Sequence, residues 1–172
     1  MKISIEKCVE SDLLALSSIS YETYKDTFLN QNSPVNMYQY LNNAFGIKKI
    51  HSELLNKDSC FYFIYHDKNL AGYFKINESP AQTDIHDNLS LELERIYLKK
   101  EFQGKGLGKI MLNYAIDIAS NKNKGYIWLS VWEKNIHAIQ FYKNNGFSQF
   151  AVHPFIMGNE EQTDLLMKKN LK

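Results

Sequence analysis

The segment Gln103-Gly104-Lys105-Gly106-Leu107-Gly108-Lys109 holds three of the eight glycines of the chain within five residues. It follows residues 89–98, which have the apolar content of a strand, and it precedes apolar residues at helical spacing from Leu107 to Ala119. The first backbone N–H groups of a helix have no partner within it and attract anions, and glycine leaves them open to a ligand. The segment therefore predicts a strand-to-helix turn that can bind a pyrophosphate group.

Two common nucleotide-binding patterns do not fit this turn. Counted from Gly104, both the phosphate-binding loop GxxxxGK[ST] and the dinucleotide pattern GxGxxG require glycine at the position of Lys109. The residues by themselves leave two possibilities open. The turn is either a pyrophosphate site of another kind or a tight connection that binds nothing.

The composition is typical of one folded domain, which we interpret as residues 1–172. The 172 residues are 44% hydrophobic and 23% charged, and the formal net charge is +1. This balance argues against a nucleic-acid-binding protein, and no apolar run is long enough to span a membrane. The two cysteines, Cys8 and Cys60, lack metal-binding spacing. Without a recognisable signal peptide, a cytoplasmic location with neither zinc nor disulfides is expected.

Periodicity predicts a mixed α/β sandwich around one twisted sheet. Ser11 and Ser33 are expected to cap the first two helices, and residues 78–88 are expected to form an exposed loop. The expected strands are 1–8, 60–65, 70–76, 89–98, 126–132, 147–156 and 163–170, and the expected helices are 11–28, 34–45, 47–56, 107–123 and 136–145.

Two motifs in this order carry a family resemblance. They are Gln103-x-x-Gly106-x-Gly108 and Asn135-x-x-Ala138-x-x-Phe141-Tyr142-x-x-x-Gly146-Phe147, with the strand Glu94-Arg95-Ile96-Tyr97-Leu98 before the first. Together they resemble the cofactor segments of the GNAT family, the Gcn5-related N-acetyltransferases. Residues 31–34, 131–135 and 157–164 further resemble bacterial spermidine/spermine N-acetyltransferases of the Pai type.

The resemblance implies a fold and a reaction. It implies a single N-acetyltransferase domain with a mixed, twisted central sheet of about seven strands, flanked by helices and splayed between the fourth and fifth strands. It implies acetyl-CoA as co-substrate, no metal, and a polyamine such as spermidine or spermine as acceptor. The amine would attack directly in a ternary complex, because no Cys or Ser is placed as an obvious nucleophile. A homodimer is a further expectation.

The resemblance also assigns the acetyl-CoA contacts. Backbone groups of Ile96, Tyr97 and Leu98 would bind the cofactor arm and polarise the thioester. The turn would contribute Gln103, Gly104, Lys105, Gly106, Leu107, Gly108 and Lys109, and Asn135 and Tyr142 would complete the site. Asn135 can equally act only as a helix cap, and the two lysines can simply be solvated.

Two residues are predicted to handle protons. Tyr142 would protonate the departing thiolate as general acid, and the alternative is an aromatic anchor of its helix. Glu94 is the expected general base because, in a regular strand, Glu94, Ile96 and Leu98 share one face near the thioester. The alternatives are that Glu94 is a surface carboxylate or pairs with Arg95, and that Tyr97 relays the proton through water.

Acceptor contacts are predicted from charge and aromaticity. Glu22, Tyr24, Glu160 and Glu161 are the candidates for binding a polyamine, with Asp26 as a further carboxylate. Other acceptors remain open, namely a protein N-terminus, a lysine or an antibiotic amine. A third possibility is an acyl-CoA sensor without catalytic activity. None of the five histidines has metal-binding spacing.

Overall fold

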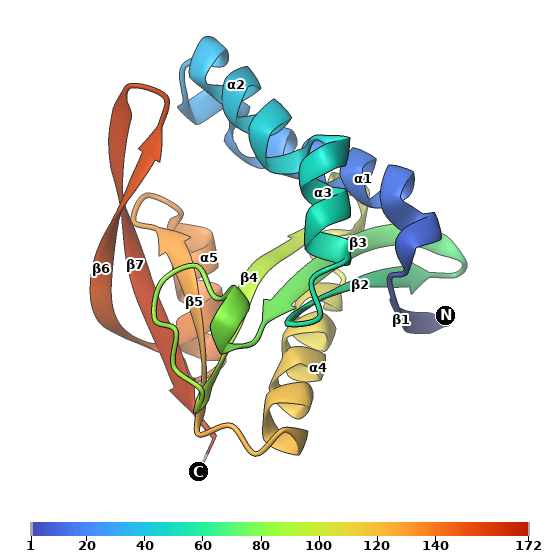
Figure 1. Ribbon diagram of the computed structural model, residues 1–172, viewed down its shortest axis with the longest axis vertical. Helices are drawn as coiled ribbons and strands as arrows, with labels where there is room; N and C mark the ends of the chain where they lie inside the picture. Colours follow the sequence, from blue (N-terminus) through green and yellow to red (C-terminus); the bar gives the residue numbers. More distant parts are fainter. Residues whose placement is uncertain (1, 172) are drawn as a thin grey trace.

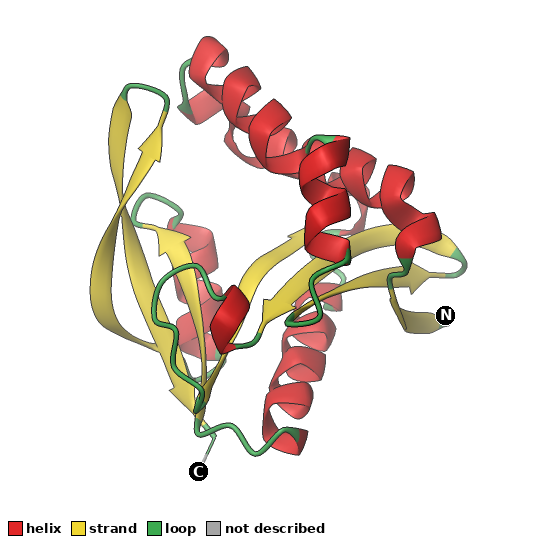
Figure 2. Cartoon of the chain, in the orientation of Figure 1, coloured by secondary structure: helices red, strands yellow, loops and turns green. Residues whose placement is uncertain are grey.

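The computed structural model describes residues 2–171, and its helices and strands follow the predicted order (Figure 1, Figure 2). The strands are β1 (Ile3–Lys7), β2 (Ser59–His66), β3 (Asn69–Asn77), β4 (Ser90–Leu98), β5 (Tyr126–Trp132), β6 (Ser148–Met157) and β7 (Glu160–Asn170). The helices are α1 (Leu13–Phe28), α2 (Pro34–Phe45), α3 (Ile47–Leu54), α4 (Leu107–Asn121) and α5 (Ile136–Asn144).

The seven strands form one sheet in the order β1-β2-β3-β4-β5-β7-β6. All neighbouring strands are antiparallel except β4 and β5, which are parallel. Helices α4 and α5 pack on one face through a core that includes Met111 and Ile139. Helices α1, α2 and α3 pack on the other face through a second core around Leu16, Met37 and Ile50. The predicted mixed sheet flanked by helices is confirmed.

The sheet is open between its fourth and fifth strands. Strands β4 and β5 pair only at Ser90–Tyr126, Leu91–Ile127 and Glu92–Trp128. Beyond Glu92 the two strands separate, whereas β4 stays paired with β3 as far as Leu98. The predicted splay is therefore present, and the edge of β4 that faces β5 has free backbone groups over its second half.

A β-bulge at Glu94 changes which face each residue of β4 occupies. Lys75 pairs with Arg95 and Ile76 pairs with Leu93, so Glu94 is one residue more than β3 can match. Leu93 packs on the α4 side, and after the bulge Ile96 does so as well. The prediction that Glu94 and Ile96 share a face is wrong, because the extra residue shifts the alternation by one.

The boundaries of several elements differ from the prediction. Ser11 lies in a 3₁₀ turn (Glu10–Asp12) that precedes α1 and is not its cap, and Ser33 precedes α2 without a side-chain capping bond. The loop 78–88 is not fully exposed, because the Gln82 side chain is buried and donates to Ser90. Met1, at the start of the first predicted strand, lies outside the described residues.

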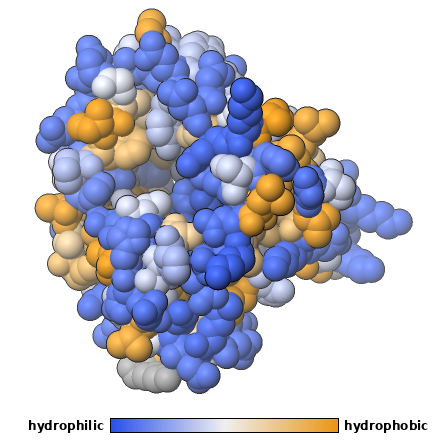
Figure 3. Space-filling model, in the orientation of Figure 1, coloured by the Kyte–Doolittle hydropathy of each residue, from blue (hydrophilic) through white to orange (hydrophobic). Residues whose placement is uncertain are grey.

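The long β6–β7 hairpin rises at one edge of the sheet toward α2 (Figure 1). Glu160 and Glu161 begin β7 at the tip of this hairpin and do not precede the strand as expected. The surface on this side is mostly hydrophilic, with hydrophobic side chains in separate groups (Figure 3). The hairpin and α2 thus frame one end of the opening between β4 and β5.

Candidate active site

A cavity of about 780 Å³ occupies the opening between β4 and β5. On one side it reaches the glycine turn and the start of α4, where Gly104, Gly106 and Gly108 line it. On the other side it extends between α1, α2 and the hairpin. We call the second region the acceptor chamber and define it by Tyr24, Tyr40, Trp132, Phe155 and Asp164 among its lining residues.

The glycine turn opens α4 toward the cavity. Gly104 and Gly106 have φ values of 73° and 79°, which a residue with a side chain rarely adopts. Gly108 is helical, and a Cβ built on it would meet Phe141 and Leu98 only at ordinary contact distances of 3.8 to 4.0 Å. Packing within the chain therefore does not require glycine at this position, whereas close approach of a ligand would.

The other predicted residues of the turn fall into two groups. Gln103 and Lys109 line the cavity, and the Gln103 amide donates to the Leu98 carbonyl at 3.1 Å at the end of β4. Lys105 and Leu107 are not among the lining residues. The Lys105 ammonium lies over the Phe102 ring, and the Leu107 side chain is fully buried in the core.

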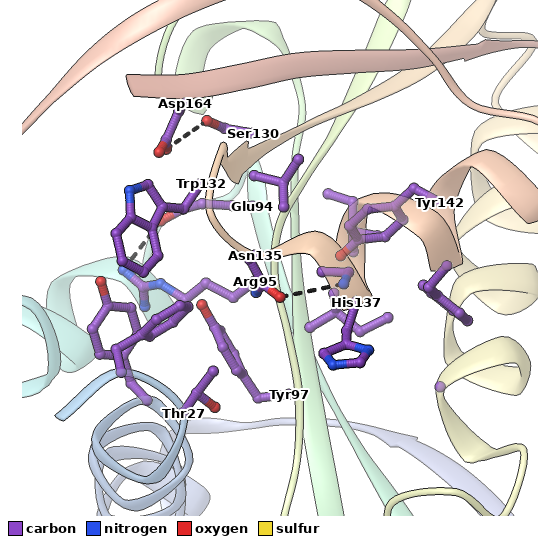
Figure 4. A pocket seen from close by; sticks show the side chains of 18 of the residues that line it. Thr27, Glu94, Arg95, Tyr97, Ser130, Trp132, Asn135, His137, Tyr142 and Asp164 are labelled. Atoms are coloured by element: carbon purple, nitrogen blue, oxygen red, sulfur yellow. Dashed lines mark hydrogen bonds and ion pairs between the residues drawn. The ribbon is translucent and has the colours of Figure 1, made fainter. Parts of the chain in front are cut away.

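Asn135 caps helix α5. Its side-chain oxygen accepts a hydrogen bond from the Ala138 backbone N–H at 3.2 Å (Figure 4), which is the geometry that stabilises a helix start. Asn135 also lines the cavity. The capping role is confirmed, and the contact with a cofactor stays a prediction.

Tyr142 reaches the cavity from α5. The residue is only 7% exposed and lines the cavity, and its phenolic oxygen forms no hydrogen bond to any residue between 2 and 171. Burial raises the pKa of its phenol above the ordinary value of 10.0. At neutral pH the phenol is therefore a protonated donor whose hydrogen is not taken up by any residue from 2 to 171, and a general acid must start in this protonated state.

Glu94 lies in a buried network of four charged side chains. It contacts the Lys75 ammonium at 2.5 Å and the Arg95 guanidinium at 3.1 Å, and it accepts from the Asn77 amide at 2.6 Å. Arg95 in turn pairs with both carboxylate oxygens of Glu53 on α3 at 2.9 and 3.1 Å. Two cations thus balance two carboxylates.

This network makes Glu94 a poor proton acceptor. Burial alone would raise its pKa, but the charges of Arg95 and Lys75 outweigh burial and lower the pKa to about 2. A carboxylate held this firmly in its charged form has almost no tendency to take a proton from an amine near neutral pH. The structure therefore favours the alternative in which Glu94 pairs with Arg95, and it does not support the predicted role as general base.

The acceptor chamber is walled by seven aromatic rings. Each ring centroid lies between 4.6 and 6.5 Å from that of another member of the group. They come from α1, α2 and strands β4, β5 and β6. The rings are those of Tyr24, Phe28, Tyr40, Phe45, Tyr97, Trp132 and Phe155, and all seven residues line the cavity.

The acidic residues of the cavity are not those predicted as acceptor contacts. Tyr24 lines it as expected, but Glu22, Glu160 and Glu161 do not. Glu22 instead faces Lys99 at 3.7 Å. The lining carboxylates are Asp84, Glu92, Glu94 and Asp164.

Two sequence motifs meet at the mouth of the chamber. Asn32 accepts a hydrogen bond from Gln162 at 2.6 Å, and Asn36 donates to Asn159 at 2.7 Å, so α2 and its preceding turn are joined to the β6–β7 hairpin. Gly158 is essential to this contact, because a Cβ there would lie 2.3 Å from the Asn36 side-chain oxygen. Segments 31–34 and 157–164, distant in sequence, thus form one side of the site.

Among residues 2–171, no three His, Cys, Asp or Glu side chains gather as a metal site would require. None of the helices in this part of the chain has the length and apolar character that a membrane crossing needs.

Comparison with known proteins identifies the class. The model of the Acetyltransferase (GNAT) family matches residues 19–147, and the chain belongs to this family of N-acetyltransferases. An uncharacterized N-acetyltransferase of Lactobacillus delbrueckii subsp. lactis is 40% identical over 169 residues, 98% of each chain. The family resemblance of the glycine turn is confirmed.

Two findings concern the Pai-like resemblance. The spermidine N(1)-acetyltransferase of Thermoplasma acidophilum is 28% identical over 151 residues, which are 86% of this chain and 89% of the relative. A crystal structure of PaiA N-acetyltransferase from Thermoplasma acidophilum, in complex with coenzyme A, superposes with a TM-score of 0.80 at 26% identity, covering 99% of both chains. The resemblance extends over nearly the whole chain.

Proposed function

We propose that this protein transfers the acetyl group of acetyl-CoA to a primary amine of a polyamine such as spermidine or spermine. One observation carries the proposal. A single cavity joins the glycine turn and the open edge of β4 to a chamber lined by aromatic rings and carboxylates. The first region suits a pyrophosphate with a thioester arm, and the second suits an aliphatic cation.

The cavity fits acetyl-CoA in two respects. The glycine turn presents the start of α4 without side chains at Gly104, Gly106 and Gly108. The free edge of β4 offers the backbone groups of Ile96, Tyr97 and Leu98, which do not pair with β5. Acetyl-CoA would supply an activated acyl group there. A backbone amide directed at the thioester oxygen would stabilise its developing charge by about 3–4 kcal/mol.

The transfer needs no nucleophile from the protein. Neither cysteine lines the cavity, and burial raises the pKa of Cys8. The acceptor nitrogen, as the free amine, forms its bond to the acetyl carbon as the C–S bond breaks, and the proton that the nitrogen then loses passes through solvent to restore the Tyr142 phenol. Tyr142 gives its phenolic proton to the departing sulfur, and the chamber walls orient the amine for attack.

A panel of acceptors tests the proposal. Thiol release and product mass are measured with spermidine, spermine, a lysine peptide, a peptide with a free α-amino group and an aminoglycoside. We expect kcat/KM for the polyamines to exceed that of every other acceptor by roughly tenfold or more, a difference of about 1.4 kcal/mol. Faster turnover of a peptide or the aminoglycoside would instead assign that acceptor. Coenzyme A binding without turnover of any amine would favour the sensor.

Replacing Gly108 by Ala should separate folding from cofactor binding. Alanine favours a helix over glycine by up to about 1 kcal/mol, and its Cβ finds no clash here, so stability should be unchanged or slightly higher. Coenzyme A should bind roughly tenfold more weakly, because the new methyl group stands where the ligand approaches. Calorimetric titration and thermal unfolding measure the two effects.

Asn113→Ala is the matched control, because Asn113 is an exposed residue of the same helix. It should leave the coenzyme A affinity unchanged, and its Tm should likewise be unchanged or slightly higher because alanine favours the helix. Unaltered affinity in the Gly108→Ala variant would show that Gly108 does not approach the cofactor.

A further inference from the structure

The carboxylates that line the acceptor chamber differ in how well the protein neutralises them. Glu94 has Lys75 and Arg95 as partners, and Asp84 contacts the imidazole of His153 at 2.8 Å. Glu92 accepts hydrogen bonds from the backbone and hydroxyl of Thr83 and from Asn77. Each of these three carboxylates has either a basic group or several donors.

Asp164 is the exception. Its hydrogen-bond partner is the Ser130 hydroxyl at 2.8 Å (Figure 4), and among residues 2–171 no Lys, Arg or His nitrogen lies within 4.0 Å of its carboxylate. The residue is half-buried, and this burial raises the pKa of its carboxyl. The nearby Glu133 acts in the same direction, whereas the Ser130 hydrogen bond and His153, which stands opposite Asp164 on β6 and contacts Asp84, act in the other direction. A partly desolvated carboxylate without a cation is costly to a protein.

The surroundings of Asp164 are suited to an organic cation. On the sheet it stands opposite Trp132, whose ring meets that of Phe28 at 6.2 Å. From Phe28 the aromatic wall continues to Tyr24 at 4.6 Å. Such rings attract an alkylammonium group through their faces and bury the methylene chain that carries it. A metal ion would need several oxygen ligands, which the rings do not provide.

The position of Asp164 is distinct from that of the proposed acid. Asp164 belongs to β7 and Tyr142 to α5, and Figure 4 shows them at opposite sides of the site, with Trp132 on the side of Asp164. A group bound at Asp164 is therefore not the nitrogen that receives the acetyl group.

We propose that Asp164, with the rings of Trp132 and Phe28, binds a second ammonium group of the acceptor and makes the enzyme select diamines and polyamines over monoamines. This inference rests on the proposed function, because it names the part of the cavity that binds a second charged group of the same acceptor. It assigns the selectivity to a residue that none of the sequence-based acceptor predictions included.

Asp164→Asn is the variant that tests the assignment. The amide has the shape of the carboxylate, and its oxygen can still accept from Ser130, so the local structure should persist. Removing a half-buried charge without a counter-ion should leave the Tm unchanged or raise it slightly. The control is Asp117→Asn, the same chemical change at an exposed position of α4 that does not line the cavity.

The measurement compares acceptors that differ by one ammonium group. The ratio of kcat/KM for 1,4-diaminobutane to that for butylamine is determined in the wild type and both variants. We expect Asp164→Asn to lower this ratio roughly 10- to 100-fold, mainly through KM of the diamine, as loss of a charged hydrogen-bond acceptor implies. Asp117→Asn should leave it unchanged. An unchanged ratio in Asp164→Asn, or equal losses for both amines, would overturn the assignment.

A binding experiment separates this inference from the proposed function. Hexamethonium carries two quaternary ammonium groups and has no N–H to acetylate, so its affinity can be measured by calorimetry whether or not any amine is turned over. We expect Asp164→Asn to bind hexamethonium at least roughly tenfold more weakly than the wild type does. Equal binding to both would refute the role of Asp164, even if polyamines prove to be the substrates. Absence of turnover with a preserved difference would refute only the proposed function.

Discussion

Tyr142→Phe should lower kcat by roughly 100- to 10,000-fold, the usual contribution of a general acid. The departing thiolate then has no placed proton donor. Because the phenol has no hydrogen-bond partner among residues 2–171, removing its oxygen leaves no protein group unsatisfied, and the fold should not weaken. The affinity for coenzyme A, measured by calorimetry, should change little, since the loss falls on the chemical step.

The pH profile and a matched variant complete this test. Burial raises the pKa of Tyr142, so its protonated form persists through pH 9, and the wild-type kcat should show no decline below that pH from this residue. Tyr114→Phe removes the same atom from a partly exposed tyrosine of α4 and should retain full activity. If Tyr142→Phe kept the wild-type kcat, the general-acid role would be refuted and Tyr142 would serve only to anchor α5 through its ring.

Arg95→Met should cost about 3–5 kcal/mol of the free energy of unfolding, because it leaves buried carboxylates without their main counter-ion. Both Glu53 and Glu94 lose a partner at once. The remaining cations would be the buried Lys75, which contacts both carboxylates, and the more exposed Lys49, which contacts only Glu53. For a chain of this size the Tm should fall by roughly 6–20 °C. Thermal and urea unfolding at neutral pH measure the loss.

Lys100→Met provides the comparison for this variant. Its ammonium is largely exposed and lies 3.9 Å from Asp26, so its removal should change stability by less than about 1 kcal/mol. Similar small losses in both variants would show that the buried network does not hold β4 in place.

The sequence allowed prediction of the elements where local patterns are strong. Tyr126–Trp132 was predicted with its observed bounds, and so was Pro34–Phe45. The pair Asp67-Lys68 forms the turn between β2 and β3 with positive φ values, and it lies between the predicted strands 60–65 and 70–76. The glycine turn was predicted from its own residues, whereas the splay followed from the family resemblance, because periodicity alone does not reveal where two neighbouring strands part.

The acceptor side of the site was less accessible to prediction. The chamber draws single residues from α1, α2, β5, β6 and β7, and no short motif unites Tyr40, Trp132 and Asp164. Glu160 and Glu161 were predicted as acceptor contacts because they form an acidic pair, but they lie at the hairpin tip and do not line the cavity. The surroundings of Glu94 were not predicted, because a bulge is invisible to an alternation rule and because Glu53, which shares Lys75 and Arg95 with Glu94, is 41 positions away in the sequence.

The bulge at Glu94 has a consequence for how this strand tolerates change in length. Side chains alternate between the two faces of a strand, and the unpaired residue Glu94 puts this alternation out of phase between the two halves of β4. Deleting a single residue between Leu93 and Ile96 would remove the bulge and bring the two halves into phase, so Ile96 would still face α4 and Tyr97 the opposite side. Only one residue would then remain between them, where Glu94 and Arg95 now both enter the buried network. The spacing between Leu93 and Ile96 is therefore as much a part of the site as the identity of any side chain in it.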